Sequence, residues 1–203
     1  ANILTKHYPD LQIWKFASPL KQVAWLILGK EYPKEFFIDF PFNSSELFER
    51  IEQATVLIGV YPTTTLIHMV YKKLTGEEFN HDQITYINLT VRKLLQILGT
   101  DCYRDLCYPD VWVDYLMRRI DELPKTANII ITDVRFLNEQ LAIQRRGGII
   151  ILITRDGLSV DSHFSENALS RYSPDCIVEN DEDIEDFEKN ILSLFKRLTK
   201  NFH

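Results

Sequence analysis

The stretch that most constrains the fold runs from Asn128 to Arg155. Ile129–Ile131 form an apolar run that ends shortly before Asp133. A segment with helical spacing follows and stops at Gly147–Gly148, as helix C-termini favour. Ile149–Ile153 then form a second continuous β-branched run. Continuous apolar runs are typical of strands buried on both faces, so this stretch predicts a parallel α/β sheet with a helical crossover.

Charged side chains follow both predicted strands. Asp133 and Arg135 come after the first strand, and Arg155 comes directly after the second. In open α/β sheets, ligands bind beyond the carboxyl ends of the strands. We therefore look for the active site at this edge of the sheet.

Composition limits the class of protein. A chain of 203 residues with 45% hydrophobic content can form one sizeable core, and nothing in it requires a second domain. The formal net charge of −6 argues against non-specific binding to nucleic acid or to an anionic membrane. No apolar stretch approaches the ~20 residues that span a bilayer. Cys102, Cys107 and Cys176 lack metal-ligand spacing and are odd in number, which fits a reducing cytoplasm.

The N-terminal region has the same α/β pattern. Ala1–Lys6 reads as the end of a helix, which leads us to expect further residues upstream, and Leu11–Ala17 is a predicted strand. Pro19 stands at the first position of a predicted helix that ends at Gly29. Lys21 lies in the first turn of this helix, near the carboxyl end of the strand. The alternative for Lys21 is a solvated surface lysine.

The next region has no clean period at first and then two helical patterns. His68 has apolar neighbours there, and a structural histidine is the expected reading. We predict an irregular loop, two helices and a polar loop, in the order Tyr32–Phe42, Ser44–Ala54, Thr63–Leu74 and Thr75–Asn88.

Thr90–Asp101 predicts an amphipathic helix, because its apolar residues fall at i, i+3, i+4 and i+7. Arg92, Lys93 and Gln96 lie on the other side, and Gly99 is expected to close the helix. Two cations and an amide on one face can hold a phosphate and hydrogen-bond a planar base. The alternative is an ordinary helix with a solvated basic face.

Pro109 opens another predicted helix, which runs to about Asp121. Trp112 in its first turn is either a core residue or a platform that stacks on a base, an interaction worth ~1–3 kcal/mol. After the central stretch we predict a polar loop, a short strand and the acidic start of a final helix, at Asp156–Pro174, Asp175–Val178 and Asp181–Asp186.

Asp133 at a strand end resembles the acidic position that holds magnesium in phosphate-transferring α/β enzymes. Arg135 and Arg155 would neutralise charge on a transferring phosphoryl group, and Arg92 and Lys93 add cations from another helix. A structural ion pair is the default alternative for any single arginine. We expect Arg92, Arg135 and Asp133 to meet at one rim of the sheet.

Several motifs stand in a specific order: FASPLK, RKLLQILGTD, Trp112, TDVRFLNE, RRGG, ITR and DSHFSE, which start at Phe16, Arg92, Trp112, Thr132, Arg145, Ile153 and Asp161. Together they resemble the deoxynucleoside monophosphate kinases of large tailed bacteriophages. The resemblance covers most of the chain up to about Asp181 and is weakest from Tyr32 to Asn88.

The resemblance implies an α/β fold of the adenylate-kinase-like P-loop type. It would be a three-layer parallel sheet flanked by helices, with a mostly helical insertion, in one domain over residues 1–203. The implied reaction moves the γ-phosphoryl of ATP to a deoxynucleoside 5′-monophosphate with Mg²⁺. It serves phage deoxynucleotide synthesis in the host cytoplasm and needs no nucleic-acid or membrane partner. A homodimer is also compatible with the resemblance.

The resemblance also assigns residues. The substrate side comprises Lys21, Arg92, Lys93, Gln96, Gly99, Thr100, Trp112, Asp133, Arg135 and Glu139. On physical grounds, Arg92 and Lys93 would bind the acceptor phosphate, Gln96 the base edge, and Trp112 the base or sugar. Asp133, Arg135 and Arg155 would be catalytic, with Arg155 entering as a lid closes. Arg155, Asn180 and Asp181 would contact ATP.

The sequence departs from the pattern in one respect, because no GxxxxGK(S/T) phosphate loop occurs in it. The nearest match, Ala24–Glu31, lies in an apolar helix with Glu31 in place of Ser or Thr. A phosphate loop would therefore be expected just before Ala1. Two alternatives stay open: a non-catalytic nucleotide-binding module, and a kinase of another small phosphorylated metabolite, since animal phosphomevalonate kinases are distantly similar.

Overall fold

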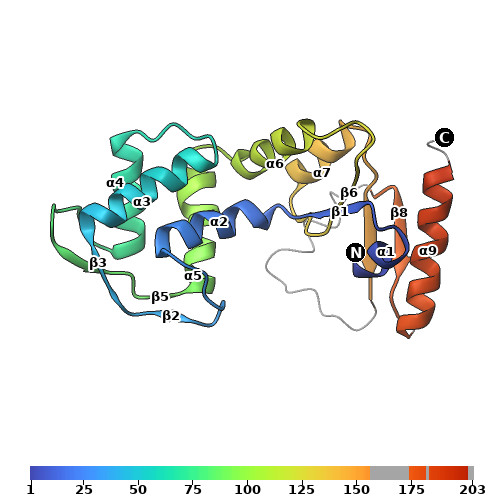
Figure 1. Ribbon diagram of the computed structural model, residues 1–203, viewed down its shortest axis with the longest axis horizontal. Helices are drawn as coiled ribbons and strands as arrows, with labels where there is room; N and C mark the ends of the chain where they lie inside the picture. Colours follow the sequence, from blue (N-terminus) through green and yellow to red (C-terminus); the bar gives the residue numbers. More distant parts are fainter. Residues whose placement is uncertain (156–173, 182, 201–203) are drawn as a thin grey trace. The chain divides into compact units, whose positions relative to one another are not determined.

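The computed structural model describes residues 1–155, 174–181 and 183–200, which form two compact units (Figure 1). The first unit comprises Ala1–Lys15 and Pro124–His203, and the second comprises Phe16–Leu123. Helices and strands occur in both units, which confirms the α/β class. A single kinase-like domain over the whole chain stays a prediction.

The first unit contains two parallel strand pairs. β1 pairs with β6, with Leu11 opposite Asn128, and β7 pairs with β8, with Ile151 opposite Cys176. Its elements are α1 (Asn2–His7), β1 (Leu11–Trp14), β6 (Asn128–Ile131), α7 (Leu137–Gln144), β7 (Ile151–Thr154), β8 (Cys176–Glu179) and α9 (Ile184–Lys200). The predicted strand, helix, glycine stop and strand of the central stretch are therefore confirmed, and Gly147 has the left-handed φ of +75°.

The side chains of the two strands in the central stretch are less buried than predicted. Among the described residues, β6 and β7 each belong to a two-stranded sheet and do not pair with each other. Ile153 is 53% exposed, so burial of β7 on both faces is wrong: a two-stranded sheet covers only part of each strand. Both pairs nevertheless contribute to one apolar cluster with α1 and α9, formed by Leu4, Leu11, Val178, Ile191 and Leu194. The three-layer sheet itself is not confirmed.

The second unit is mainly helical and has the larger core. Its elements are α2 (Ala17–Leu28), β2 (Phe37–Ile38), β3 (Pro41–Asn43), α3 (Ser44–Leu57), α4 (Thr64–Thr75), β4 (Ile84–Tyr86), β5 (Leu89–Thr90), α5 (Val91–Gln96), the π-helix η1 (Ile97–Arg104) and α6 (Val111–Asp121). α2 buries Val23, Ala24 and Ile27 and ends at Gly29 with a φ of +82°, as predicted. No helix in the described parts of either unit has the length and apolar character needed to cross a membrane.

Two antiparallel strand pairs lie where the sequence predicts loops. β2 pairs with β5, and β3 pairs with β4. Strands of two or three residues are too short to show an alternating pattern, which explains why the prediction missed them. The two predicted helices of this region are confirmed as α3 and α4. His68 is structural, because its Nδ1 lies 2.7 Å from the Thr64 carbonyl oxygen and its ring packs on Phe48 and Phe79.

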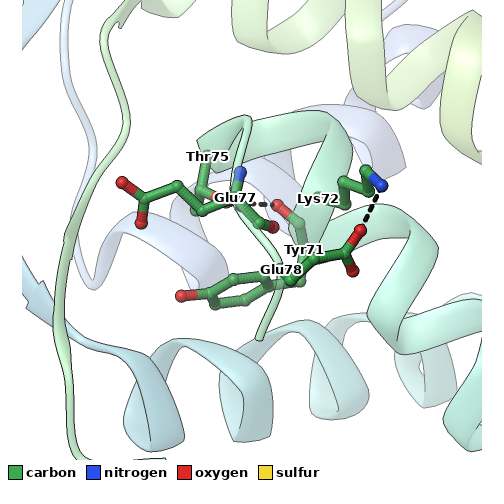
Figure 2. Close-up of polar contacts among 5 residues, drawn as sticks. All are labelled: Tyr71, Lys72, Thr75, Glu77 and Glu78. Atoms are coloured by element: carbon green, nitrogen blue, oxygen red, sulfur yellow. Dashed lines mark hydrogen bonds and ion pairs between the residues drawn. The ribbon is translucent and has the colours of Figure 1, made fainter. Parts of the chain in front are cut away.

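The end of α4 leads into β4 through a hydrogen-bonded turn. Figure 2 shows Thr75, whose hydroxyl donates to the Tyr71 carbonyl at 3.0 Å, and Lys72 pairing with Glu78. The Glu77 N–H donates back to the Thr75 hydroxyl at 3.1 Å. The Glu77 carboxylate accepts from the Thr85 hydroxyl at 2.9 Å and so ties the turn to β4.

Gly99 does not close the helix that begins at Val91. α5 continues directly into the π-helix η1, which runs on to Arg104, so the predicted helix end is wrong. Gly99 is buried, and a Cβ at this position would lie 3.0 Å from the Leu20 Cδ2 atom. The glycine is therefore explained by the close approach of η1 to α2 and not by a helix stop. Single π-turns within α-helices are frequent at functional sites.

Candidate active site

The backbone amides at the start of α5 already have protein partners. The Lys93 N–H donates to the Thr90 hydroxyl at 3.2 Å, the cap that the sequence allows at this position. The Val91 N–H donates to the Phe36 carbonyl, and the Arg92 N–H donates to the Lys34 carbonyl, both at 2.9 Å. A phosphate at this place would therefore be held by side chains and not by the helix terminus.

Arg92 is exposed and holds a carboxylate. Its Nη2 atom lies 3.2 Å from Oε1 of Glu35, a residue 57 positions earlier in the chain. A backbone hydrogen bond, followed by the Arg92 guanidinium, holds the pKa of the Glu35 carboxyl below its ordinary value. An exposed pair of this kind contributes little to stability. Its geometry shows, however, that Arg92 is placed to receive an anionic oxygen.

The other polar candidates of the second unit lie on its surface. Lys93, Gln96 and Thr100 are exposed along α5 and η1. Lys21 is exposed too, but it lies past the first turn, because α2 begins at Ala17 and not at the predicted Pro19. The predicted basic face of α5 is therefore present. The structure does not bring Lys21 into contact with Arg92 by any described hydrogen bond or ion pair.

Trp112 lies in the core of the second unit. Its side chain is 2% exposed, and its ring packs edge-on against Tyr103 at a centroid distance of 5.6 Å. Its indole N–H donates to the Gly99 carbonyl at 3.0 Å. These contacts support the alternative in which Trp112 is a core residue, and they bring together two residues that the resemblance assigned to the substrate pocket.

A buried polar pair supports the same π-helix from the other side. The Tyr103 hydroxyl lies 3.0 Å from the Thr55 hydroxyl, which also donates to the Ile51 carbonyl at 2.8 Å. Burial raises the pKa of Tyr103, and it raises the pKa of the neighbouring Cys102 thiol to about 12. Cys102 is fully buried, and burial disfavours its thiolate form, which fits a core thiol.

In the first unit, Glu139 organises the turn that follows β6. Its carboxylate is 2% exposed and accepts the N–H of Arg135 at 2.8 Å and the N–H of Phe136 at 3.1 Å. A carboxylate that reaches back over the first turn satisfies amides that have no helical partner. Asp133 in the same turn is half-buried, and the Arg135 side chain is exposed. The structure thus joins the Arg135 backbone to the Glu139 carboxylate, which has a structural role here. The predicted place of both residues beside the substrate stays a prediction.

The ends of β7 and β8 bring the predicted ATP-side residues together. Thr154 is opposite Glu179, and the Asn180 N–H donates to the Thr154 carbonyl at 2.8 Å. Arg155 and Asn180 therefore leave the same end of one parallel pair, where Arg155 is exposed. Asp181 follows and is exposed.

The predicted DSHFSE motif, Asp161–Glu166, lies outside the described residues. The acidic run before the last helix is explained in part by capping, because Asp183 Oδ1 accepts the N–H groups of Glu185 and Asp186. Glu35 is not among the predicted site residues, although the Lys34–Glu35–Phe36 order after Pro33 is a usable signal of a charged turn.

The carboxylates of the described residues are the candidates for holding a divalent metal. Within the described ranges, no three side chains of His, Cys, Asp or Glu are grouped closely enough to hold an ion. Mg²⁺ in phosphate-transferring enzymes commonly takes one or two carboxylates, with phosphate oxygens and water completing the shell. The single half-buried carboxylate of Asp133 fits that donor set.

Comparison with known proteins identifies the family of this chain. The profile of the deoxynucleotide monophosphate kinase family matches residues 8–191. A protein of Acanthamoeba polyphaga mimivirus, described as "Putative deoxynucleotide monophosphate kinase", is 38% identical over 133 residues, which cover 59% of this chain and 68% of the viral protein. The family match spans both units and every candidate residue named above. The chain therefore belongs to the deoxynucleotide monophosphate kinase family, and it is a phosphotransferase.

Proposed function

We propose that the enzyme transfers the γ-phosphoryl group of ATP to the phosphate of a deoxynucleoside 5′-monophosphate, with Mg²⁺, and so forms the diphosphate. The observation that carries this proposal is the Arg92 guanidinium, which already holds a carboxylate 3.2 Å away at the start of a basic helix face. Guanidinium groups bind carboxylates and phosphates through the same paired N–H donors.

The second unit would bind the acceptor. Arg92 and Lys93 contact the monophosphate, and Gln96 reads the base edge, because amide groups both donate and accept hydrogen bonds. Lys21 and Thr100 supply further polar contacts on the exposed surface. Gly99 and Trp112 would support the site indirectly. The Gly99 carbonyl accepts a hydrogen bond from the buried Trp112 indole, which holds η1 in place.

The first unit would handle the donor and the transferring group. Asp133 would hold Mg²⁺, which would neutralise charge on the phosphates of ATP when bound. Arg135 and Arg155 would stabilise the charge that develops during transfer. Asn180 and Asp181 would border the adenine. Glu139 positions Arg135, because its carboxylate accepts a hydrogen bond from the Arg135 backbone N–H.

We also propose that the two parallel strand pairs of the first unit belong to the three-layer sheet of a P-loop kinase. Their shared apolar cluster supports this. The Ala24–Glu31 match is not the phosphate loop, because Gly29 caps the end of α2 instead of leading into a helix. Sequencing the codons upstream of Ala1 tests for a GxxxxGK(S/T) motif there. The setting we propose is phage deoxynucleotide synthesis in the host cytoplasm, with a homodimer as the assembly to test by light scattering.

The direct experiment is a coupled assay of ATP consumption with the full-length protein and each of the common deoxynucleoside monophosphates, together with modified cytosine nucleotides. We expect turnover with at least one of them and dependence on added Mg²⁺. Binding of a nucleotide without turnover would instead favour a non-catalytic binding module. Turnover with a phosphorylated metabolite that has no base would favour the third alternative.

A further inference from the structure

A segment rich in aromatic residues, more than 50 positions earlier in the chain, lies beside the start of α5. The residues from Lys34 to Ile38 run beside those from Leu89 to Arg92, through the β2–β5 pair and the two hydrogen bonds that cap α5. The Phe36 carbonyl accepts a hydrogen bond from the Val91 N–H, and the Glu35 carboxylate forms an ion pair with Arg92. The aromatic side chain of Phe36 is thus tied by backbone contacts to the residue that we assign to the acceptor phosphate.

The Phe36 ring stacks on another aromatic ring and is partly exposed to solvent. Its centroid is 4.4 Å from that of Tyr32, with an angle of 20° between the ring planes, so the two rings stack. Tyr32 is held in turn by Phe40, at 5.8 Å, and by the Lys30 ammonium, 5.0 Å from its centroid. Phe36 nevertheless stays 37% exposed. A ring fixed by a neighbour loses little freedom when a ligand lands on it.

A nucleotide needs an aromatic or apolar surface for its base and cations for its phosphate. Trp112 does not offer that surface in this structure, because it is 2% exposed and its N–H is engaged. Phe36 offers one within a residue of the Glu35 carboxylate that Arg92 holds. Aromatic side chains stack on any base, because every base has a π-face.

We propose that Phe36, supported by Tyr32, is the platform on which the base of the acceptor deoxynucleotide stacks, while its phosphate replaces the Glu35 carboxylate on Arg92. This inference rests on the proposed function. It moves base recognition from the core tryptophan to the segment before β2, and it makes Glu35 the anion that occupies Arg92 until substrate binds.

The test compares two neighbouring phenylalanines. Phe36→Ala should weaken equilibrium binding of deoxynucleoside monophosphates, measured calorimetrically without ATP, by about tenfold, and raise the KM for the acceptor to a similar degree. Phe37→Ala is the matched control, because Phe37 is the next residue along the chain and is also exposed, at 53%. Its binding should stay within about twofold of wild type.

Further variants separate stacking from folding. Phe36→Trp keeps an aromatic face and should retain wild-type binding, whereas Phe36→Leu keeps apolar packing on Tyr32 and should lose affinity. Equal binding by the Trp and Leu variants, or equal losses in Phe36→Ala and Phe37→Ala, would overturn the inference. Thermal melts of all four variants identify any loss that comes from unfolding, and the comparison is then made between the variants that fold.

Arg92→Ala distinguishes this inference from the proposed function. If Arg92→Ala weakens acceptor binding and Phe36→Ala does not, the phosphate site stands and the base platform is wrong. If neither substitution affects binding in an active enzyme, the acceptor site proposed on the second unit is itself wrong.

Discussion

The two units place their candidate residues by different means. In the second unit, the candidates lie on and beneath a helix that packs over a large core, which includes buried Trp112 and Tyr103. In the first unit, the candidates follow the ends of parallel strands whose cluster is small and whose side chains include exposed Ile13 and Ile153. The candidate residues of the second unit therefore depend on tertiary packing, whereas those of the first unit depend on the backbone register of strand pairs.

This difference separates effects on stability from effects on catalysis. A substitution in the core that supports η1 should destabilise the second unit. Any effect on the proposed substrate site would then be indirect and follow from that loss of stability. A substitution at a strand end of the first unit should leave the fold and change the reaction.

Trp112→Ala should destabilise the protein most, by about 3–5 kcal/mol, because it leaves a cavity beside Tyr103 and an unpaired Gly99 carbonyl. Urea unfolding measures the change. Trp14→Ala in β1 is the control in the first unit, where the half-buried indole donates to Gln12, two residues away. It should lose less than half as much. Equal losses would remove the contrast between the two units.

Glu139→Ala should be the exception within the first unit. It removes a buried carboxylate that accepts two backbone N–H groups, and we expect a loss of about 1–3 kcal/mol in urea unfolding. Glu52→Ala, on the exposed side of α3, is the matched control and should change stability by less than about 0.5 kcal/mol. If Glu139→Ala unfolds like wild type, then Glu139 does not order this turn.

The buried hydroxyl pair sharpens the contrast further. Thr55→Val and Tyr103→Phe should each cost about 1 kcal/mol, because the Thr55–Tyr103 hydrogen bond lies in the core. The double variant should cost less than the sum, since both substitutions remove the same bond. Strict additivity in urea unfolding would show that the two hydroxyls do not interact.

The smallest effect is expected for the exposed Glu35–Arg92 pair, through its dependence on pH. The pKa of Glu35 is lowered in the folded protein, so its contribution is present above the ordinary glutamate pKa and is lost as the pH falls through the lowered value. The stability difference between wild type and Glu35→Gln should therefore be constant at neutral pH and disappear in acid. A difference that persists in acid would exclude the ion pair as its source.

Much of the fold follows from local patterns, and the failures have a common cause. The α2 helix with its glycine stop and the β6–α7–β7 order were predicted, because each is encoded by neighbouring residues. The four short strands of the second unit were missed, because two- and three-residue strands depend on partners far along the chain. Gly99 was read as a stop for the same reason, since its role depends on Leu20 and Trp112.

The candidate site divides in the same way. The types of residue at the strand ends and on the basic helix face could be chosen from the sequence. Their partners could not, because Glu35 reaches Arg92 across 57 positions and the indole of Trp112 faces inward to Gly99. A tryptophan in a first helical turn has the same sequence signature whether it packs in a core or stacks on a base.

The account is tested most directly by steady-state kinetics of Arg92→Ala and Arg155→Ala in which both substrates are varied. We predict that Arg92→Ala raises the KM for the deoxynucleoside monophosphate, or lowers kcat, by at least about tenfold while the KM for ATP is unchanged. Arg155→Ala should lower kcat, or raise the KM for ATP, while acceptor binding measured without ATP is unchanged. Near-normal kinetics in Arg92→Ala, or an exchange of the two patterns, would contradict the assignment of acceptor and donor to the two units.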